Sequence, residues 1–290
     1  MPKVSVIMPC YNQGPYIHEA VNSVLEQSFK DIEIIIVNDG STDPFTNDLL
    51  KNFSARGVTI YSTENRGVSA ARNLGIEKCG GEYILPLDSD DRISGNYIND
   101  ALTKLINNPA LKLVYCEGQY FGEEEGIINL PPFTVKGMLK QNLVFCTAMF
   151  RKADWKASGG YDEAFLTGWE DWEFWLRLID NESQVYKLTE LGFHYRIKQN
   201  SRNADIINLN LQLAEQQLLK KHWKLYLSYY PRPIGLIREY EFLQNEVTQF
   251  EEYKKQLSNS FSYRLGSFIL SPVKALTNKW KAGQQKNHLR

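Results

Sequence analysis

The sequence lacks several features that would each assign it to a class of protein. It has only four cysteines among 290 residues, and no pair of them has zinc-ligand or redox-motif spacing. No apolar run is long enough to span a bilayer. The formal net charge of −1 argues against a nucleic-acid-binding protein that relies on positive charge. We therefore expect a protein of a reducing compartment with no nucleic-acid partner.

We also expect no secretory leader, and the sequence shows no glycine-rich nucleotide loop after the first predicted strand. A strand is expected almost at once, over Val4–Met8, which leaves no room for a secretory signal. The residues that follow, Pro9 to Gly14, contain no Gly-x-Gly-x-x-Gly and no basic residue. A dinucleotide oxidoreductase needs the glycine motif in this loop, and a nucleotidyltransferase that holds a triphosphate usually needs a basic residue there. We expect a cytoplasmic protein of another class.

The first half of the chain alternates short β-rich runs with amphipathic stretches. The strands are expected over 4–8, 32–38, 58–62, 83–87 and 111–115, and the helices over 16–27, 43–55, 68–79 and 96–107. This alternation is typical of βαβ units and predicts an α/β fold with a mainly parallel central sheet flanked by helices.

The second half is less regular. We expect a loop over 118–136, strands over 143–150 and 186–195, and helices over 171–179, 206–223 and 234–257. The domains predicted from these elements are an α/β domain over 1–203, a helical extension over 204–260 and a tail over 261–290.

The tail is basic and rich in large apolar residues. After Glu252 no acidic residue follows, whereas lysines, arginines, Phe261, Phe268 and Trp280 do. This composition favours a segment lying on a membrane surface, with a tail packed on the protein by its apolar side as the alternative. Pro272 would divide a helix there.

An acidic cluster, Asp88-Ser89-Asp90-Asp91, ends the apolar run 83–87. Carboxylates this close repel one another unless a cation or a donor-rich ligand neutralises them. Mg²⁺ or Mn²⁺ shared with a substrate's phosphates would do so. A polar turn that caps the next helix explains the same residues, because Asp and Ser favour turns and N-caps.

Polar residues follow the other predicted strands as well. They form the segments 9–12, 38–43 and 65–73. Each alone is ordinary turn chemistry, but the carboxyl ends of parallel strands share one edge of a sheet, so we expect one crevice there. Tyr11, Asp39 and Arg72 could stack on a base, accept from its N–H and bind phosphate.

Two adjacent acids, Glu170 and Asp171, lie among tryptophans at the start of a predicted helix. A carboxylate in this position could take the proton from an attacking hydroxyl. The pair can also be plain helix-start acids beside a core rich in tryptophan.

Taken together, these segments resemble family 2 glycosyltransferases of the GT-A fold, of the non-processive type that builds bacterial surface polysaccharides. The resemblance covers about residues 3–200. It is carried by six ordered matches, at residues 5–12, 37–43, 67–75, 87–91, 159–163 and 170–171.

The resemblance implies roles for individual residues. The donor site is formed by Pro9, Tyr11, Asn12, Asp39, Gly67, Arg72, Asp88, Ser89 and Asp90. Within it, Asp39 would accept from a pyrimidine N3–H, which suits a UDP-sugar and also allows a dTDP-sugar. Asp171 would be the general base, beside acceptor-binding Trp169 and Glu170.

A Mn²⁺ or Mg²⁺ cofactor is also implied by the resemblance. Its ligands would be Asp90 and His194, although a lone histidine can equally be a satisfied core residue. Processive members carry Gln-x-x-Arg-Trp, whereas Asn203 follows Arg202 here. We therefore expect transfer of one or a few sugars to a glycan or a lipid-linked acceptor, at the inner face of the membrane if the tail binds there. A non-catalytic scaffold and a sugar nucleotidyltransferase are the alternatives.

Overall fold

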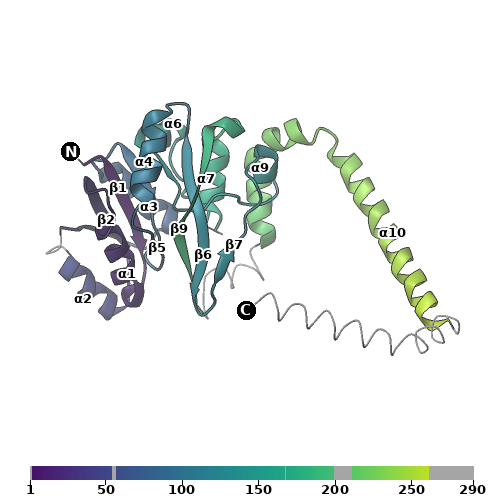
Figure 1. Ribbon diagram of the computed structural model, residues 1–290, viewed down its shortest axis with the longest axis horizontal. Helices are drawn as coiled ribbons and strands as arrows, with labels where there is room; N and C mark the ends of the chain where they lie inside the picture. Colours follow the sequence, from purple (N-terminus) through teal and green to yellow (C-terminus); the bar gives the residue numbers. More distant parts are fainter. Residues whose placement is uncertain (1, 54–56, 167, 199–210, 261–290) are drawn as a thin grey trace, which may run out of the picture. The chain divides into compact units, whose positions relative to one another are not determined.

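The computed structural model describes residues 2–53, 57–166, 168–198 and 211–260 (Figure 1). The chain forms two compact units, the first ending at Tyr226 and the second beginning at Leu227. The functional boundaries expected at 203 and 260 stay predictions, and the tail over 261–290 lies outside the described residues.

The first unit is built on one mixed sheet. Within the described residues its strands are β1 (Val4–Cys10), β2 (Ile32–Asp39), β3 (Thr59–Thr63), β4 (Tyr83–Pro86), β5 (Arg92–Ile93), β6 (Leu113–Gly122), β7 (Gly126–Ile128), β8 (Met149–Arg151) and β9 (Val185–Ile197). Their order is β3-β2-β1-β4-β8-β6-β9-β5, and β7 pairs with β6.

The amino-terminal half of this sheet is parallel. β1 lies between β2 and β4, with Val6 opposite both Ile34 and Leu85. The carboxyl ends of these three strands therefore share one edge, where the chain order reverses and open α/β sheets bind ligands. In the other half β8 runs antiparallel to β4 and β6, while β9 is parallel to β6.

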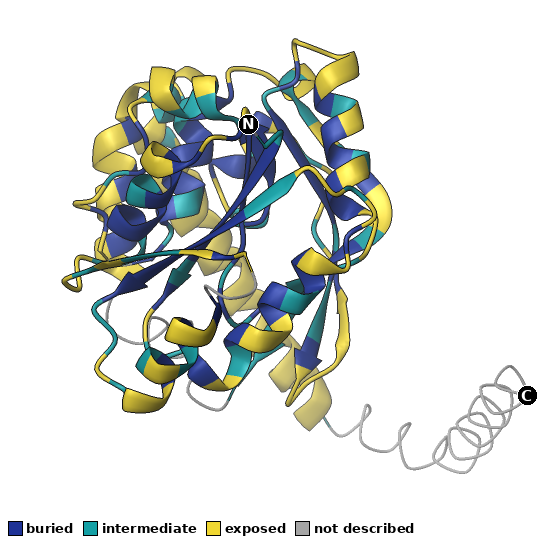
Figure 2. Ribbon diagram, turned by 90° about the vertical axis from the view of Figure 1, so that its left-hand side faces the viewer, coloured by how far each residue is buried: buried dark blue, intermediate teal, exposed yellow. Residues whose placement is uncertain are grey.

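Helices surround the sheet, and most of them bury apolar residues. They are α1 (Gly14–Leu25), α2 (Pro44–Phe53), α3 (Val68–Lys78), α4 (Tyr97–Asn107), α5 (Val135–Met138), α6 (Lys152–Ser158), α7 (Glu170–Leu178) and α9 (Leu211–Tyr229), with a 3₁₀ turn, η2, at Glu182–Gln184. In α1 the buried residues Ile17, Ala20, Val21 and Val24 recur with helical spacing. Figure 2 shows the strands largely buried and the helices striped with buried and exposed residues.

Close packing of α3 on the sheet depends on Gly75. A Cβ atom at this position would lie 2.6 Å from Cγ2 of Ile7, which real side chains do not tolerate. The glycine thus brings the helix that carries Arg72 directly against β1.

Most of the predicted elements are confirmed within a few residues. The strand expected over 143–150 is wrong for residues 143–148, which form an irregular segment before β8. The loop expected over 118–136 is also wrong in part, because β6 continues to Gly122 and pairs with β7. The helix expected from residue 206 is described from Leu211 onward as α9.

The second unit contains one long helix, α10 (Pro233–Asn259). None of its residues is buried, and Tyr240, Leu243 and Phe250 are among its exposed large apolar side chains. Across the described part of the chain, no helix combines the length and hydrophobicity needed to cross a membrane.

Candidate active site

A cleft of about 820 Å³ opens at the edge where β1, β2 and β4 end. Its walls come from the loops after these strands, the segment before β8, the start of α7 and the end of β9. The sequence predicts this convergence from the placement of polar residues after parallel strands, and the structure shows it.

The predicted site residues can be placed against this cleft. Eleven of them line it: Pro9, Tyr11, Asp39, Gly67, Arg72, Asp88, Ser89, Asp90, Trp169, Glu170 and Asp171. Asn12 and His194 are not among the lining residues.

Asp39 is fixed by the backbone of the loop that enters α3. Its Oδ1 and Oδ2 accept from the N–H groups of Arg66 and Gly67, both at 2.9 Å. Each oxygen keeps a second lone pair, so the carboxylate can still accept from a ligand. Tyr11, 44% exposed, lines the cleft beside Asp39, so the pair offers a stacking face and an acceptor.

Asn12 supports the loop after β2 instead of lining the cleft. Its Oδ1 accepts from the N–H groups of Thr42 and Asp43, and its own N–H donates to Ser41. The residue adopts a left-handed conformation with φ of 54°, which asparagine tolerates better than most residues. Asn12 thus holds this loop in place, and its predicted contact with the donor stays a prediction.

Arg72 joins the two halves of the cleft. Its guanidinium donates to Oδ1 of Asp88 at 2.6 Å and to Oε1 of Glu170 at 2.9 Å, and the side chain is 1% exposed. Burial opposes this charge, but Asp88 and Glu170 more than offset it and raise the pKa of Arg72 well above its ordinary value. Its predicted nucleotide contact stays a prediction.

Asp171 lies in the first turn of α7, on the wall facing the acidic cluster. Its Oδ2 accepts from Nδ2 of Asn142 at 3.0 Å, and its Oδ1 from the backbone N–H of Trp172. Burial and the charge of Glu170 raise the pKa of Asp171 to about 7, although Arg72 opposes the shift. A carboxylate with this pKa is a stronger base than an exposed aspartate.

The turn before α7 is strained. Trp169 has φ of 65°, a conformation rare for a bulky residue. Such backbone persists only where the surrounding structure enforces it, and it is concentrated at functional sites. Here it directs Trp169, Glu170 and Asp171 toward the same cleft.

The predicted metal ligands, Asp90 and His194, are both engaged by other side chains. Both ring nitrogens of His194 have other partners, Ser94 at 2.9 Å and Gln119 at 2.8 Å. Oδ2 of Asp90 accepts from the ammonium of Lys198 at 2.5 Å. A divalent cation on Oδ2 of Asp90 would have to displace Lys198, and one on His194 would have to displace Ser94 or Gln119, so this pair as arranged does not fit the ion that the sequence predicts.

A different group could offer ligands to a metal ion. Oxygen or sulfur atoms of Asp88, Asp91 and Cys146 lie within 4.8 Å of one another. Asp91 is 1% exposed and accepts from the backbone of Arg196, and burial raises the pKa of Cys146 well above its ordinary value. A protonated thiol is a poor ligand, and Mg²⁺ or Mn²⁺ prefers oxygen.

Other residues of the cleft were not predicted from the sequence. They include Gln13, Asn142, Cys146, Tyr195, Arg196 and Lys198. Asn142 precedes the segment predicted as a strand. Arg196 and Lys198 closely follow the predicted strand 186–195, and two basic residues at a strand end could have been predicted to line the cleft.

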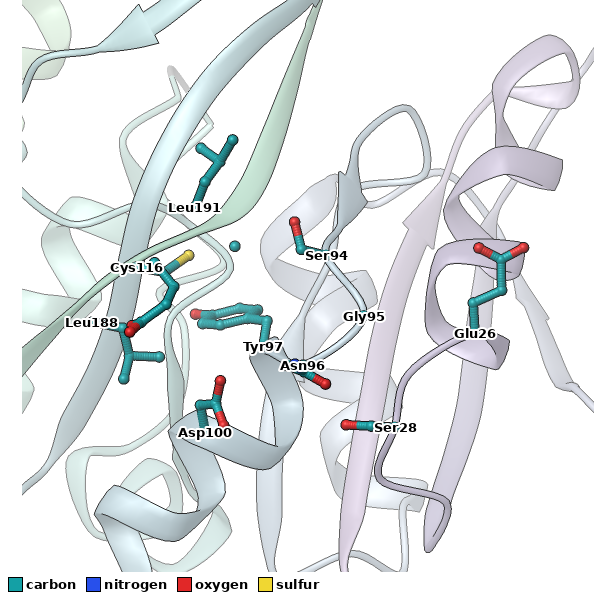
Figure 3. A pocket seen from close by; sticks show the side chains of 12 residues that line it. Glu26, Ser28, Ser94, Gly95, Asn96, Tyr97, Asp100, Cys116, Leu188 and Leu191 are labelled. Carbon is teal, nitrogen blue, oxygen red and sulfur yellow. The ribbon is translucent and has the colours of Figure 1, made fainter.

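A second cavity of about 360 Å³ lies elsewhere in the first unit (Figure 3). It is bordered by Ser94, Tyr97 and Asp100 of the β5–α4 region and by Cys116 of β6. Burial raises the pKa of Cys116 to about 12, so its thiol is not an activated nucleophile. The chemistry of the protein is concentrated in the larger cleft.

Comparison with known proteins agrees with this geometry. Residues 5–166 match the family described as glycosyl transferase family 2, which is more than half of the chain. The chain belongs to glycosyl transferase family 2. The matched range includes Asp39, Arg72 and the acidic cluster of this family 2 protein, whereas Asp171 and Lys198 lie beyond it.

Curated relatives of this family 2 protein include bacterial enzymes. Glycosyltransferase GlyA of Streptococcus pneumoniae is 38% identical over 43% of this chain, but the match covers only 18% of GlyA. The putative teichuronic acid biosynthesis glycosyltransferase TuaG of Bacillus subtilis is 29% identical, with 78% of this chain and 87% of TuaG covered.

The fold is also found among solved structures. TarS residues 1–349 of S. aureus, in complex with UDP-GlcNAc, superimpose with a TM-score of 0.60 at 20% identity. The match covers 78% of this chain and 73% of that one, and shows that this family 2 protein has the same fold.

Proposed function

We propose that this protein is an inverting glycosyltransferase. It moves a sugar from a nucleoside-diphosphate sugar, with a UDP-sugar as the first choice and a dTDP-sugar as the second, to a hydroxyl of a glycan or lipid-linked acceptor. One observation carries the proposal. A single cleft contains Asp39 and the acidic cluster, which suit a nucleotide diphosphate, together with Asp171, whose pKa is raised to about 7.

The donor half would hold the nucleotide. Tyr11 offers a ring to the base and Asp39 accepts from a base N–H, held rigid by the backbone of Arg66 and Gly67. The diphosphate then lies toward Asp88 and Asp90, where Arg196 and Lys198 supply positive charge. Complexes of TarS with UDP and UDP-GlcNAc support a donor of this class.

The transfer step needs one base and one leaving group. Asp171 takes the proton of the acceptor hydroxyl as that oxygen bonds to the anomeric carbon, and the bond from this carbon to the phosphate oxygen breaks. The nucleoside diphosphate leaves from the opposite face, so the anomeric configuration inverts. Asn142, bonded to Oδ2 of Asp171, fixes the carboxyl in place.

Mn²⁺ or Mg²⁺ is a further expectation from the family resemblance. Such an ion, where bound, neutralises charge on the departing diphosphate. The contacts of Asp90, with Lys198 at 2.5 Å, and of His194, with Ser94 and Gln119, argue against this pair as its ligands.

Surface-polysaccharide assembly is the setting we propose. The name of TuaG, which refers to teichuronic acid biosynthesis, supports this setting. The hyaluronan synthase of Pasteurella multocida, which is similar to 96% of this chain, supports it as well. The membrane surface would be reached through the basic tail.

Nucleotide binding tests the proposal directly. UDP, dTDP and GDP are titrated into the purified protein by calorimetry, with Mn²⁺ and with EDTA, and UDP-sugar hydrolysis is then measured. We expect UDP to bind and at least one UDP-sugar to be cleaved. No binding of any nucleotide in either buffer would reject the transferase and leave the scaffold alternative.

A further inference from the structure

We propose that Lys198 supplies the fixed positive charge for the donor's diphosphate, so that the donor binds without a divalent cation. This inference rests on the proposed function and concerns how the same site handles charge. It is suggested by the contact between Lys198 and Asp90, the residue that the sequence predicts as a metal ligand.

Lys198 is held in place by three neighbouring side chains. Its ammonium lies 2.5 Å from Oδ2 of Asp90 and 3.3 Å from Oε1 of Gln13, and it lies 4.8 Å from the ring centroid of Tyr16. Two hydrogen bonds use two of the three N–H groups of an ammonium, and the third can reach a ligand oxygen. Because the charge is positioned in advance, little order has to be gained when a phosphate arrives.

The other cations of the cleft are more fully engaged. Within the described residues, three basic side chains line it: Arg72, Arg196 and Lys198. Arg72 is 1% exposed and paired with Asp88 and Glu170, and the guanidinium of Arg196 lies 2.9 Å from Glu19. Lys198, with a side chain 19% exposed, is the most accessible of the three, since Arg196 is 11% exposed and also donates to the backbone oxygen of Asp90.

A donor diphosphate is an anion, and the cleft that would bind it is already rich in carboxyl groups, so it needs the positive charge of Lys198. Five carboxyl groups line the cleft, namely Asp39, Asp88, Asp90, Glu170 and Asp171. An additional anion beside them is repelled unless a cation compensates. An ion pair between Lys198 and Asp90 removes one negative charge from this set and presents a donor to the phosphates.

The experiment measures UDP affinity by calorimetry in EDTA and in Mn²⁺, for the wild type and for two variants at residue 198. Lys198→Met removes the charge and keeps much of the side-chain length, whereas Lys198→Arg keeps the charge. Lys112→Met is the matched control, because Lys112 also lies 2.5 Å from an aspartate, Asp154, but away from the cleft.

We expect the wild type to bind UDP in EDTA, with an affinity that Mn²⁺ changes by less than about threefold. A charged hydrogen bond to phosphate contributes enough that Lys198→Met should bind about 10- to 100-fold more weakly. Lys198→Arg and Lys112→Met should stay within a few-fold of the wild type.

Two results would overturn the inference while leaving the transferase intact. One is UDP binding by the wild type in Mn²⁺ but not in EDTA. The other is binding in EDTA that Lys198→Met leaves unchanged. Failure of UDP, dTDP and GDP to bind in every buffer would instead reject the proposed function itself.

Discussion

Asp171 has two charged neighbours that shift its pKa in opposite directions. Glu170 repels its ionised form and Arg72 attracts it, and burial tips the balance toward a raised pKa. Glu170 is itself tied to Arg72 at 2.9 Å. The adjacent acids therefore differ in their surroundings, which supports the proposed role of Asp171 as the base.

Replacing Asp171 by Asn should remove the base and keep the shape of the site. We expect a loss of about 10²–10⁴-fold in kcat, the usual range for a general base. UDP affinity should change little, because Asp171 lies in the acceptor half of the cleft. The measurement is sugar transfer or UDP-sugar hydrolysis beside UDP calorimetry, and a variant with normal turnover would remove Asp171 from the mechanism.

The pH profile of the wild type follows from the same group. A general base works in its ionised form, so kcat/KM should rise with pH through an apparent pKa near 7 and level off above about pH 8. The profile is measured between pH 5.5 and 9 with a saturable UDP-sugar. A profile that is flat over this range would show that another group takes the proton.

At the level of helices, the carboxylate of Glu173 links α7 to α9. Glu173 is fully buried, and it accepts from Arg177 in α7 and from Nε2 of His222 in α9, the latter at 3.0 Å. Lys221 lies 3.0 Å from the same oxygen. Because α7 carries Asp171, this cluster supports the wall of the active site from behind.

Changing Glu173 to Gln should destabilise the protein by about 1–3 kcal/mol, since it leaves the partly exposed Arg177 and Lys221 without their counter-charge. Urea denaturation at pH 7 measures the effect. Glu77→Gln, at an exposed position of α3, is the control and should have almost no effect.

The destabilisation should also depend on pH. Burial alone would raise the pKa of Glu173, but hydrogen bonds from His222 and Arg177 lower it from 4.5 to about 2. The contribution is therefore complete above the unfolded value of 4.5 and declines as pH falls from there toward 2. The gap between Glu173→Gln and wild type should be smaller at pH 4 than at pH 7.

At the scale of the whole molecule, the basic tail predicts membrane association. The chain should co-sediment with vesicles that contain anionic lipid, more weakly at high salt, and not with neutral vesicles. Each lysine near such a surface contributes about 1 kcal/mol, so changing Lys274, Lys279 and Lys281 together to Gln should reduce partitioning by about 100-fold. Binding that ignores both lipid charge and this change would contradict the prediction.

The alternating half of the chain was predictable because its signal is local. Ile34–Val37 is an uninterrupted apolar run, and all four residues are buried. The segment 143–148 is equally apolar, yet it is irregular, because it forms a wall of the cleft where tertiary contacts override strand propensity. The position of the cleft was predictable as well, because the polar residues that follow the strands are also a local feature of the sequence.

Partners across the sequence could not be predicted. The pairing of Asp90 with Lys198 joins residues 108 positions apart, and that of Arg72 with Glu170 joins residues 98 apart. Motif matching names these acids and Arg72, but it does not show that Arg72 pairs with Glu170 or that Lys198 pairs with Asp90. For His194 the motif suggests a metal ion, whereas the fold supplies Ser94 and Gln119 as its partners. A motif read along the sequence does not include these residues.

The fork of Arg72 between Asp88 and Glu170 bears on the order of events in a catalytic cycle. A diphosphate that contacts Asp88 would also act on the guanidinium that holds Glu170 in the first turn of α7, and we therefore expect the acceptor half to be ordered after the donor half is filled. We expect initial-rate and product-inhibition patterns of an ordered sequence, donor first, and a random sequence in Arg72→Lys, whose ammonium lacks the planar fork that joins both acids. Substrate timing would then be governed by a side chain that is almost hidden from solvent.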